Sequence, residues 1–136
     1  MESILVTGGA GFIGSHTCFL LLKKGYDVFI LDSFINSSKK SIKKILLTLE
    51  FENIYCHEKI HLIKGDIKNK DDIEKVFDLS LKFKKKIIAV IHFAGLKSVL
   101  ESTFEPLNYW ENNLYGTINL LIIMKKFKCK NIVFSS

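Results

Sequence analysis

The stretch VTGGAGFIGS, residues 6–15, decides the fold of this chain. An apolar run, Ser3 to Thr7, leads directly into three glycines spaced as G-x-x-G-x-x-G, and a helical pattern begins at once. Glycine is needed at each position for a separate reason: Gly8 allows a tight turn, Gly11 lets the backbone approach a pyrophosphate, and Gly14 lets the helix pack closely on the strand. The stretch therefore predicts a phosphate-binding loop at a helix N-terminus.

The rest of the chain alternates between two patterns. Short runs that are apolar throughout predict strands buried on both faces, as in a parallel sheet: Ile4–Val6, Val28–Leu31, Ile60–Ile63, Ile87–Ile91 and Ile132–Phe134. Stretches with helical spacing separate them: Ile13–Lys24, Lys39–Leu49, Asp71–Phe83 and Leu107–Phe127. The segment Phe51–Lys59 fits neither pattern and is interpreted as a loop. We predict a doubly wound α/β fold, Rossmann-like, with about five parallel strands alternating with helices and truncated after the fifth strand.

Composition bounds the class of protein. With 136 residues, 48% of them apolar, the chain is long enough for one domain, residues 1–136. The longest nearly apolar run, Ile118 to Met124, is far short of the roughly 20 residues that cross a bilayer, and the first ten residues lack the features of a signal peptide. We therefore expect a cytoplasmic protein with no membrane partner.

The net charge of +6 does not predict a nucleic-acid partner. All 20 basic residues are lysines, so the arginine forks that read guanine edges and phosphates are absent from the sequence. Lysine clusters such as residues 84–86 are better explained as solvated helix faces and ends. The three cysteines, Cys18, Cys56 and Cys129, lie far apart, have no neighbouring histidine at metal-ligand spacing, and are expected to be buried free thiols. We expect no bound metal.

Asp32 closes the second predicted strand eighteen residues after Gly14. This is where an acid accepts hydrogen bonds from the adenosine ribose of a dinucleotide. A carboxylate there repels a 2′-phosphate and no arginine is nearby, so NAD is favoured over NADP, although Lys39 and Lys40 are close in sequence. The alternative is that Asp32 is an ordinary turn residue.

Asp66 closes the third predicted strand, in the stretch Lys64-Gly65-Asp66-Ile67. An acid at the carboxyl end of a strand can accept the adenine amino group. It can equally be the N-cap of the next helix. From these residues alone the two interpretations stay open.

Several stretches together resemble the extended short-chain dehydrogenase/reductases. Besides the glycine loop they are Asp32 with Asn36-Ser37, Gly65-Asp66-Ile67, His92-Phe93-Ala94-Gly95-Leu96-Lys97, Glu101-Ser102 and Asn112-Asn113. Within that family the chain is similar to the UDP-glucose 4-epimerases, over essentially its whole length. The segment His92–Lys97 carries most of this distinction, because related nucleotide-sugar dehydratases have an H-x-A-A-x-S-H type of segment there.

The resemblance implies positions for the cofactor. Phe12 and Ile13 would lie against the pyrophosphate, and Asp66 and Ile67 would hold adenine. Six consecutive residues would wrap the adenosine ribose: Asp32, Ser33, Phe34, Ile35, Asn36 and Ser37. The nicotinamide side would be formed by Phe93, Ala94, Gly95, Leu96 and Lys97, with Asn112 helping to position the cofactor. His92 is expected to be a packing residue at the end of its strand.

The resemblance also implies an activity. UDP-glucose 4-epimerases interconvert UDP-galactose and UDP-glucose through a 4-keto intermediate, with NAD exchanging hydride and a Tyr/Lys pair in Y-x-x-x-K moving the proton. The one Y-x-x-x-K here, Tyr55 to Lys59, precedes the third strand, on the adenine side, and is not expected to be catalytic. Ser135 and Ser136 resemble the start of the family's Ser-Ser-Ser segment, so we expect an N-terminal portion with no catalytic residue of its own, inactive alone.

Three interpretations of function remain. The first is the cofactor-binding part of a UDP-glucose 4-epimerase, which implies a UDP-sugar substrate and a homodimer for the full-length enzyme. The second is part of another nucleotide-sugar enzyme of the same family, a dehydratase or decarboxylase. The third is an NAD-binding module without catalysis.

Overall fold

The computed structural model describes residues 2–35, 37–94 and 106–135, apart from the side chains of Tyr109, Glu111 and Asn112. The described residues form five strands: β1 (Glu2–Thr7), β2 (Asp27–Asp32), β3 (Ile60–Lys64), β4 (Lys86–His92) and β5 (Asn131–Phe134). The helices between them are α1 (Phe12–Lys23), α2 (Lys39–Phe51), α3 (Lys70–Lys82), α5 (Pro106–Tyr109) and α6 (Gly116–Lys126). A 3₁₀ turn, His57–Lys59, precedes β3, and a π-helical segment, Trp110–Tyr115, joins α5 to α6.

The five strands form one sheet in the order β3-β2-β1-β4-β5, and every neighbouring pair is parallel. The chain builds outward from β1 to β3 on one side and then crosses to β4 and β5 on the other. The switch therefore lies between β1 and β4. In open parallel sheets of this kind, ligands bind in the crevice beyond the carboxyl ends of the strands at that switch. The predicted doubly wound fold is confirmed.

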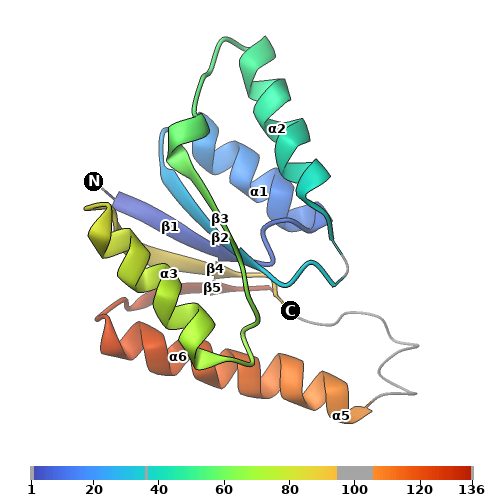
Figure 1. Ribbon diagram of the computed structural model, residues 1–136, viewed down its shortest axis with the longest axis vertical. Coiled ribbons are helices and arrows are strands. Elements are labelled where there is room, and N and C mark those ends of the chain that lie inside the picture. Colours follow the sequence, from blue (N-terminus) through green and yellow to red (C-terminus); the bar gives the residue numbers. More distant parts are fainter. Residues whose placement is uncertain (1, 36, 95–105, 136) are drawn as a thin grey trace.

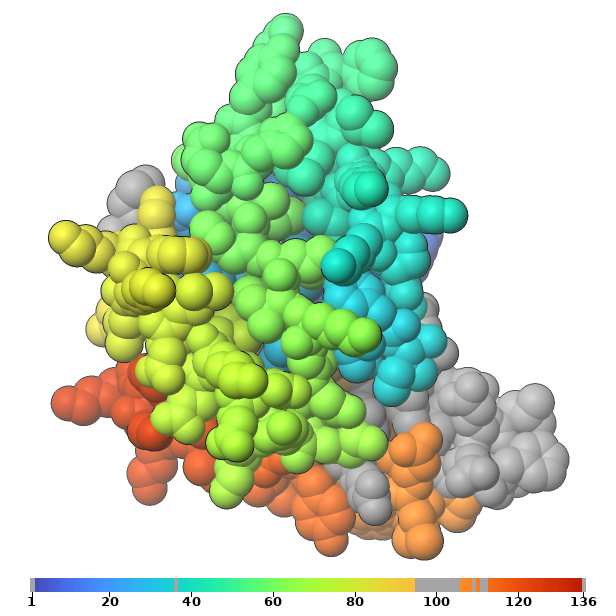
Figure 2. Space-filling view, in the orientation of Figure 1, coloured from blue at the N-terminus to red at the C-terminus, as the bar shows by residue number. Residues whose placement is uncertain are grey.

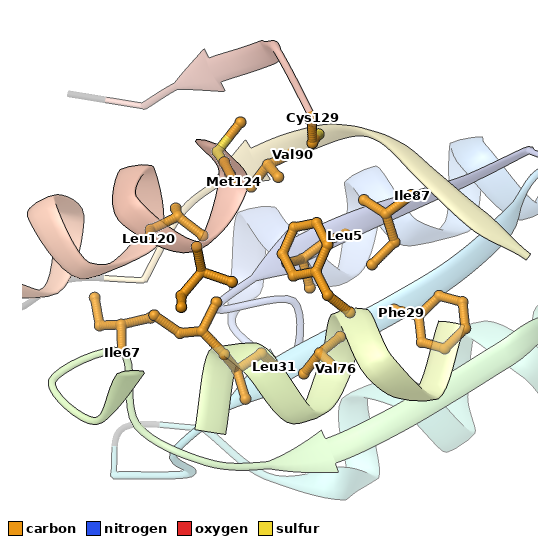
Figure 3. Close-up of a cluster of buried hydrophobic side chains, with 13 residues drawn as sticks. Leu5, Phe29, Leu31, Ile67, Val76, Ile87, Val90, Leu120, Met124 and Cys129 are labelled. Atoms are coloured by element: carbon orange, nitrogen blue, oxygen red, sulfur yellow. The ribbon is translucent and has the colours of Figure 1, made fainter. Parts of the chain in front are cut away.

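Helices cover both faces of the sheet, α1 and α2 on one and α3 and α6 on the other (Figure 1). Alternate residues of each central strand face opposite layers. Leu5, Phe29 and Leu31 pack with residues of α3 and α6, such as Val76 and Leu120 (Figure 3). On the other face the core consists mainly of Ile4, Val6, Val28, Ile30, Cys18, Leu22, Ile42 and Leu49. Burial on both faces is why the strands are apolar throughout.

The helix starts differ in a way that bears on the site. The Ser38 side chain caps α2 by accepting from the Lys40 N–H, and the Asn69 side chain caps α3 by accepting from the Asp71 N–H. Helix α1 has Gly11 at its cap position, with no side-chain cap and no acidic residue in its first turn. Its first N–H groups are therefore left for another acceptor.

Two expectations about helices are corrected. The predicted single helix Leu107–Phe127 is interrupted, because residues 110–115 form a π-helical segment, which an apolar periodicity does not distinguish from an α-helix. The predicted loop Phe51–Lys59 is partly helical. Helix α2 continues through Phe51 and closes at Asn53, whose φ of 61° lets the Ile54 N–H reach the Leu49 carbonyl.

The structure agrees with the expectation for the cysteines: Cys18, Cys56 and Cys129 are free and buried. Within residues 2–35, 37–94 and 106–135, no helix is long and apolar enough to span a bilayer. The same residues contain no group of three or more histidine, cysteine, aspartate or glutamate side chains that could hold a metal ion.

Candidate dinucleotide site

Four loops that the sequence singles out meet at one edge of the sheet. They follow β1 (Gly8–Gly11), β2 (Asp32–Ile35), β3 (Gly65–Lys68) and β4 (Phe93–Ala94), and because the strands are parallel all four lie at the carboxyl edge. The segments after β2 (cyan) and β3 (green) adjoin on the molecular surface in Figure 2. A backbone hydrogen bond from Gly65 N–H to the Asp32 carbonyl, at 3.0 Å, ties them together. The loops after β2 and β3 are thus held together at this edge.

The glycine loop is shaped by two close approaches. Gly8 has a φ of 69°, and a Cβ there would lie 2.8 Å from the Ala94 backbone nitrogen. A Cβ on Gly14 would lie 2.3 Å from the Gly8 carbonyl oxygen, a distance that side chains do not tolerate. Glycine at these positions therefore permits the tight turn after β1 and the close packing of α1 on the strand, as predicted.

The start of α1 is open and polar. The first intrahelical hydrogen bond runs from the Ser15 N–H to the Gly11 carbonyl, so the N–H groups of Phe12, Ile13 and Gly14 have no partner inside the helix. The residues Phe12 and Ile13 are 82% and 56% exposed. Backbone donors, the positive end of the helix dipole and the missing cap together make this a position for an anion.

Asp32 connects the glycine loop to the segment after β2. Its Oδ2 accepts from the Ala10 N–H at 2.9 Å, and its Oδ1 accepts from the Phe34 N–H and the Ser37 hydroxyl, each at 2.8 Å. A carboxylate has about four acceptor positions, so these three donors leave about one, on Oδ2. The carboxylate is therefore rigidly held, with capacity for one further donor such as a ribose hydroxyl.

The segment after β2 follows the shape that Asp32 imposes. Phe34 has a φ of 61°, which the hydrogen bond from its N–H to Asp32 helps to hold. Ile35 is 62% exposed, and Ser33 and Ser37 are half-buried. These four residues follow the carboxyl end of β2, where the resemblance places the adenosine ribose.

The structure tests one of the two interpretations of Asp66, namely that it is the N-cap of α3. The side chain that caps α3 belongs to Asn69, so the N-cap interpretation of Asp66 is wrong. Asp66 Oδ1 instead accepts from the Lys68 N–H at 2.9 Å within the loop, and the Asp66 N–H donates to Asp72 Oδ2. The Asp66 side chain is about one-third exposed, whereas Ile67 is buried. Asp66 Oδ2 lies 3.9 Å from the Lys68 ammonium, so the partly exposed carboxylate at this edge keeps the capacity to accept a further hydrogen bond.

A chain of hydrogen bonds that the sequence did not predict holds the end of β4. The Thr117 hydroxyl donates to the Asn113 carbonyl, which leaves its oxygen to accept from His92 Nε2–H. His92 Nδ1 then accepts from the Thr7 hydroxyl, and the Thr7 oxygen accepts from the Ala94 N–H. The tautomer that is protonated on Nε2 fits this chain of contacts. His92 is 2% exposed, in agreement with the expected packing role.

Another contact that the sequence did not signal braces the glycine loop from outside. The Ser41 hydroxyl, in the first turn of α2, donates to the Ala10 carbonyl at 2.7 Å. Ser41 lies 31 residues from Ala10 along the chain, and a serine early in a helix is unremarkable in a sequence. Such a residue is found only when the fold brings it to the loop.

Some of the predicted site residues are outside the described part of the chain. Asn36, Gly95, Leu96 and Lys97 belong to this group, and so does the side chain of Asn112. Phe93 and Ala94 are described, and their N–H groups donate to the carbonyl and hydroxyl of Thr7. Of the residues predicted for the nicotinamide side, the structure therefore describes Phe93 and Ala94 in full.

The Tyr55–Lys59 pair lies far from this site. It precedes β3, at the amino edge of the sheet, opposite the glycine loop. Tyr55 is 68% exposed, and the Lys59 ammonium donates to the Gly25 carbonyl at 3.2 Å rather than to the tyrosine. The pair does not resemble an acid/base couple, as expected.

Fold and site together place the chain in the Rossmann-like class of α/β dinucleotide-binding domains. The model of the GDP-mannose 4,6 dehydratase family matches residues 5–136, and the chain belongs to that family. Among curated proteins, the chain is 47% identical over 135 residues to a bifunctional UDP-glucose 4-epimerase and UDP-xylose 4-epimerase of Pisum sativum, an alignment that covers 99% of this chain and 36% of the relative. A UDP-glucose 4-epimerase of Oryza sativa is 48% identical over 134 residues, covering 98% of this chain and 34% of the relative.

Solved structures give the same picture. A UDP-glucose 4-epimerase from Bifidobacterium longum, in complex with NAD⁺ and UDP, superimposes with a TM-score of 0.82 at 40% identity, covering all of this chain and 37% of that one. One from Stenotrophomonas maltophila, with bound NAD and formylated UDP-arabinopyranose, gives a TM-score of 0.83 at 36% identity with the same coverage. The chain thus spans about a third of the length of these relatives, and corresponds to their N-terminal portion.

Proposed function

We propose that this chain binds NAD as the cofactor-binding part of a UDP-glucose 4-epimerase. One observation carries the proposal: the uncapped start of α1 lies next to Asp32, whose carboxylate keeps about one acceptor position. A phosphate acceptor and a hydroxyl acceptor side by side suit the pyrophosphate and ribose of a dinucleotide. Relatives named UDP-glucose 4-epimerases, and their structures with NAD, support the choice of cofactor and reaction.

Different groups of residues would hold different parts of the cofactor. The N–H groups of Phe12 and Ile13 would receive the pyrophosphate, residues 32–37 the adenosine ribose, Asp66 and Ile67 the adenine, and residues 93–97 with Asn112 the nicotinamide half. When bound there, NAD would supply the chemistry of hydride exchange at C4 of the sugar. This chain's own part is to hold the dinucleotide and to fix the end of β4 through the contacts of His92 with Thr7 and Thr117.

The reaction and the partners belong to the longer protein. We propose interconversion of UDP-galactose and UDP-glucose in the cytoplasm, with a UDP-sugar as substrate and a homodimer as the assembly. Exposed apolar side chains on α6, Ile118, Leu121 and Ile122, support an assembly because each is more than 40% exposed. We propose that residues 1–136, a single cofactor domain, do not turn over sugar alone, since their one Y-x-x-x-K lies at the wrong edge of the sheet.

A second reaction has one observation in its favour. The matching family model is described as a GDP-mannose 4,6 dehydratase, whereas the curated relatives above are epimerases, so family membership alone does not decide between the two. In a longer form of the protein, conversion of UDP-galactose to UDP-glucose would favour the epimerase. Loss of water from a nucleotide sugar would favour the dehydratase.

The cofactor proposal is tested by titrating NAD and NADP into the purified chain by calorimetry. We expect saturable binding of NAD and weaker binding of NADP, because Asp32 repels a 2′-phosphate. The variant Asp32→Asn should weaken NAD binding about tenfold, the loss expected for one hydrogen bond to a charged group. Asp78→Asn, an exposed acid on α3, is the matched control. Failure of the wild-type chain to bind NAD would overturn the proposal.

A further inference from the structure

An asparagine on α6 holds the loop that follows β3. The two N–H groups of the Asn119 side-chain amide donate to consecutive backbone carbonyls, those of Ile67 at 3.0 Å and Lys68 at 2.9 Å. Two carbonyl acceptors at one atom identify that atom as the amide nitrogen. In the sequence Asn119 interrupts an apolar run, and its partners are about fifty residues away. Nothing in its local pattern predicts this contact.

Gly116 brings α6 close enough for this contact. It lies three residues before Asn119, on the same face of the helix. A Cβ on Gly116 would lie 2.4 Å from Ile67 Cδ1, so only glycine leaves room for the isoleucine. Ile67 is 4% exposed and points from the loop toward the core between α3 and α6 (Figure 3). The loop is therefore seated on α6 by one apolar and two polar contacts.

The polar contacts lead directly to Asp66. The Ile67 carbonyl and the Lys68 N–H belong to the same planar peptide unit. Asn119 donates to the carbonyl end of this unit, and the N–H end donates to Asp66 Oδ1 at 2.9 Å. Hydrogen bonds arranged in such a chain polarise and orient one another. The orientation of the Asp66 carboxylate is thus linked, through one rigid peptide, to a side chain on another helix.

We propose that Asn119 is a positioning residue for recognition of the adenine amino group. Held by Asn119, the peptide between Ile67 and Lys68 keeps the Asp66 carboxylate turned toward the carboxyl edge of the sheet. This proposal rests on the proposed binding of NAD with adenine at Asp66. A purely structural alternative is that Asn119 only braces the loop and contributes to the stability of the fold.

A pair of dinucleotides separates these alternatives. Nicotinamide hypoxanthine dinucleotide differs from NAD in its base, which has a carbonyl oxygen in place of the amino group. A carboxylate accepts a hydrogen bond from the amino group but repels the carbonyl oxygen. The ratio of the two dissociation constants therefore measures the contact with Asp66, and a general loss of stability or affinity does not change it.

The experiment measures this ratio by calorimetry for wild type, Asn119→Leu and Asn119→Asp. We expect wild type to prefer NAD by about tenfold or more, as for a charge-assisted hydrogen bond, and both Asn119 variants to lose most of that preference. Asn131→Leu is the matched control, because the Asn131 amide also donates to a backbone carbonyl, that of Ile88 at 3.1 Å, but on β5. Its ratio should equal that of wild type.

A double-variant cycle tests the route through Asp66. In an Asp66→Ala background, Asn119→Leu should leave the ratio unchanged, because the group that it positions is gone. A folded Asn119 variant that binds both dinucleotides more weakly, but with the wild-type ratio, would overturn the proposal. So would a wild type without preference, or unfolding of both Asn119 variants as judged by circular dichroism. If wild type bound neither dinucleotide, the proposed function itself would fail instead.

Discussion

At the scale of single residues, the site depends on buried polar side chains whose hydrogen-bonding groups all bond to other parts of the fold. Thr7 is the clearest case, because it is completely buried and its hydroxyl both donates to His92 and accepts from the Ala94 N–H. These two bonds join the ends of β1 and β4 at the switch point of the sheet. A buried hydroxyl with both capacities used is costly to replace, since its partners would be left without hydrogen bonds.

The variant Thr7→Val keeps the shape of the side chain and removes both hydrogen bonds. We expect the free energy of unfolding to fall by about 2 kcal/mol, because the Ala94 N–H and His92 Nδ1 would each lose a partner in a buried setting. Urea titration followed by circular dichroism measures the change. Thr17→Val is the control, because the Thr17 hydroxyl bonds only to the Ile13 carbonyl on the exposed side of α1. Equal effects of the two substitutions would contradict the assignment.

The three cysteine thiols are buried, and we therefore expect them to react slowly with reagents in solution. Burial raises the pKa of the Cys18 thiol to about 12, and burial also raises the pKa values of Cys56 and Cys129. At pH 8 we therefore expect almost no reaction with a thiol reagent such as Ellman's reagent in the native state, and three reactive thiols after denaturation. Rapid native labelling of Cys18 would show that the core behind the glycine loop opens.

At the scale of elements, the starts of the helices separate structural from functional positions. The side chains of Asn69 and Ser38 accept hydrogen bonds that cap α3 and α2, whereas the start of α1 has no side-chain cap. An uncapped helix start costs stability unless a ligand supplies the acceptor. This contrast holds among α1, α2 and α3; α6 has no side-chain cap either, but it continues directly from the π-helical segment.

The cap of α3 gives a measurable test at this scale. Asn69→Ala removes the acceptor for the Asp71 N–H and should lower the free energy of unfolding by about 1 kcal/mol. Lys70→Ala, at the neighbouring exposed position, is expected to have almost no effect. Thermal or urea unfolding measures both. A neutral Asn69→Ala would mean that α3 does not start as the structure shows.

At the scale of the whole molecule, the amino edge of the sheet contains a titratable cluster. Asp27 is buried on β2, with its Oδ2 3.2 Å from the Lys85 ammonium and its Oδ1 3.9 Å from His61 Nε2. The His61 ring stacks on Phe29 and lies against Phe83. Burial lowers the pKa of His61, and the nearby Lys85 charge lowers it further, while Asp27 opposes the shift.

This cluster predicts how stability depends on pH. A histidine whose pKa is lowered in the folded state binds its proton more readily when unfolded, so the free energy of unfolding falls as the pH drops below about 6.5. His61→Gln should reduce that dependence between pH 7 and 5, and His16→Gln, an exposed histidine on α1, should not. Urea titrations at several pH values measure it. A His61 variant with the wild-type pH dependence would contradict the prediction.

The sequence by itself determined the fold class and the position of the phosphate loop. Strands buried on both faces must be apolar throughout, and a glycine loop between a strand and a helix is a local arrangement. Both features therefore depend on consecutive residues and can be recognised in the sequence. The same holds for Asp32, which ends β2, and for Asp66, which lies two residues after β3. The π-helical segment and the continuation of α2 to Phe51 were missed, because periodicity does not encode small changes in helical pitch or the exact end of a helix.

Only the tertiary structure decided which polar groups form hydrogen bonds with one another. Thr7, Ser41, Thr117 and Asn119 carry no local signal, since their partners lie on other elements. The structure also showed that Asn69 rather than Asp66 caps α3, and that Tyr55 and Lys59 lie at the opposite edge from the glycine loop. A hydrogen bond or a close approach is a relation between two points in space, and the folded sheet alone brings those points together.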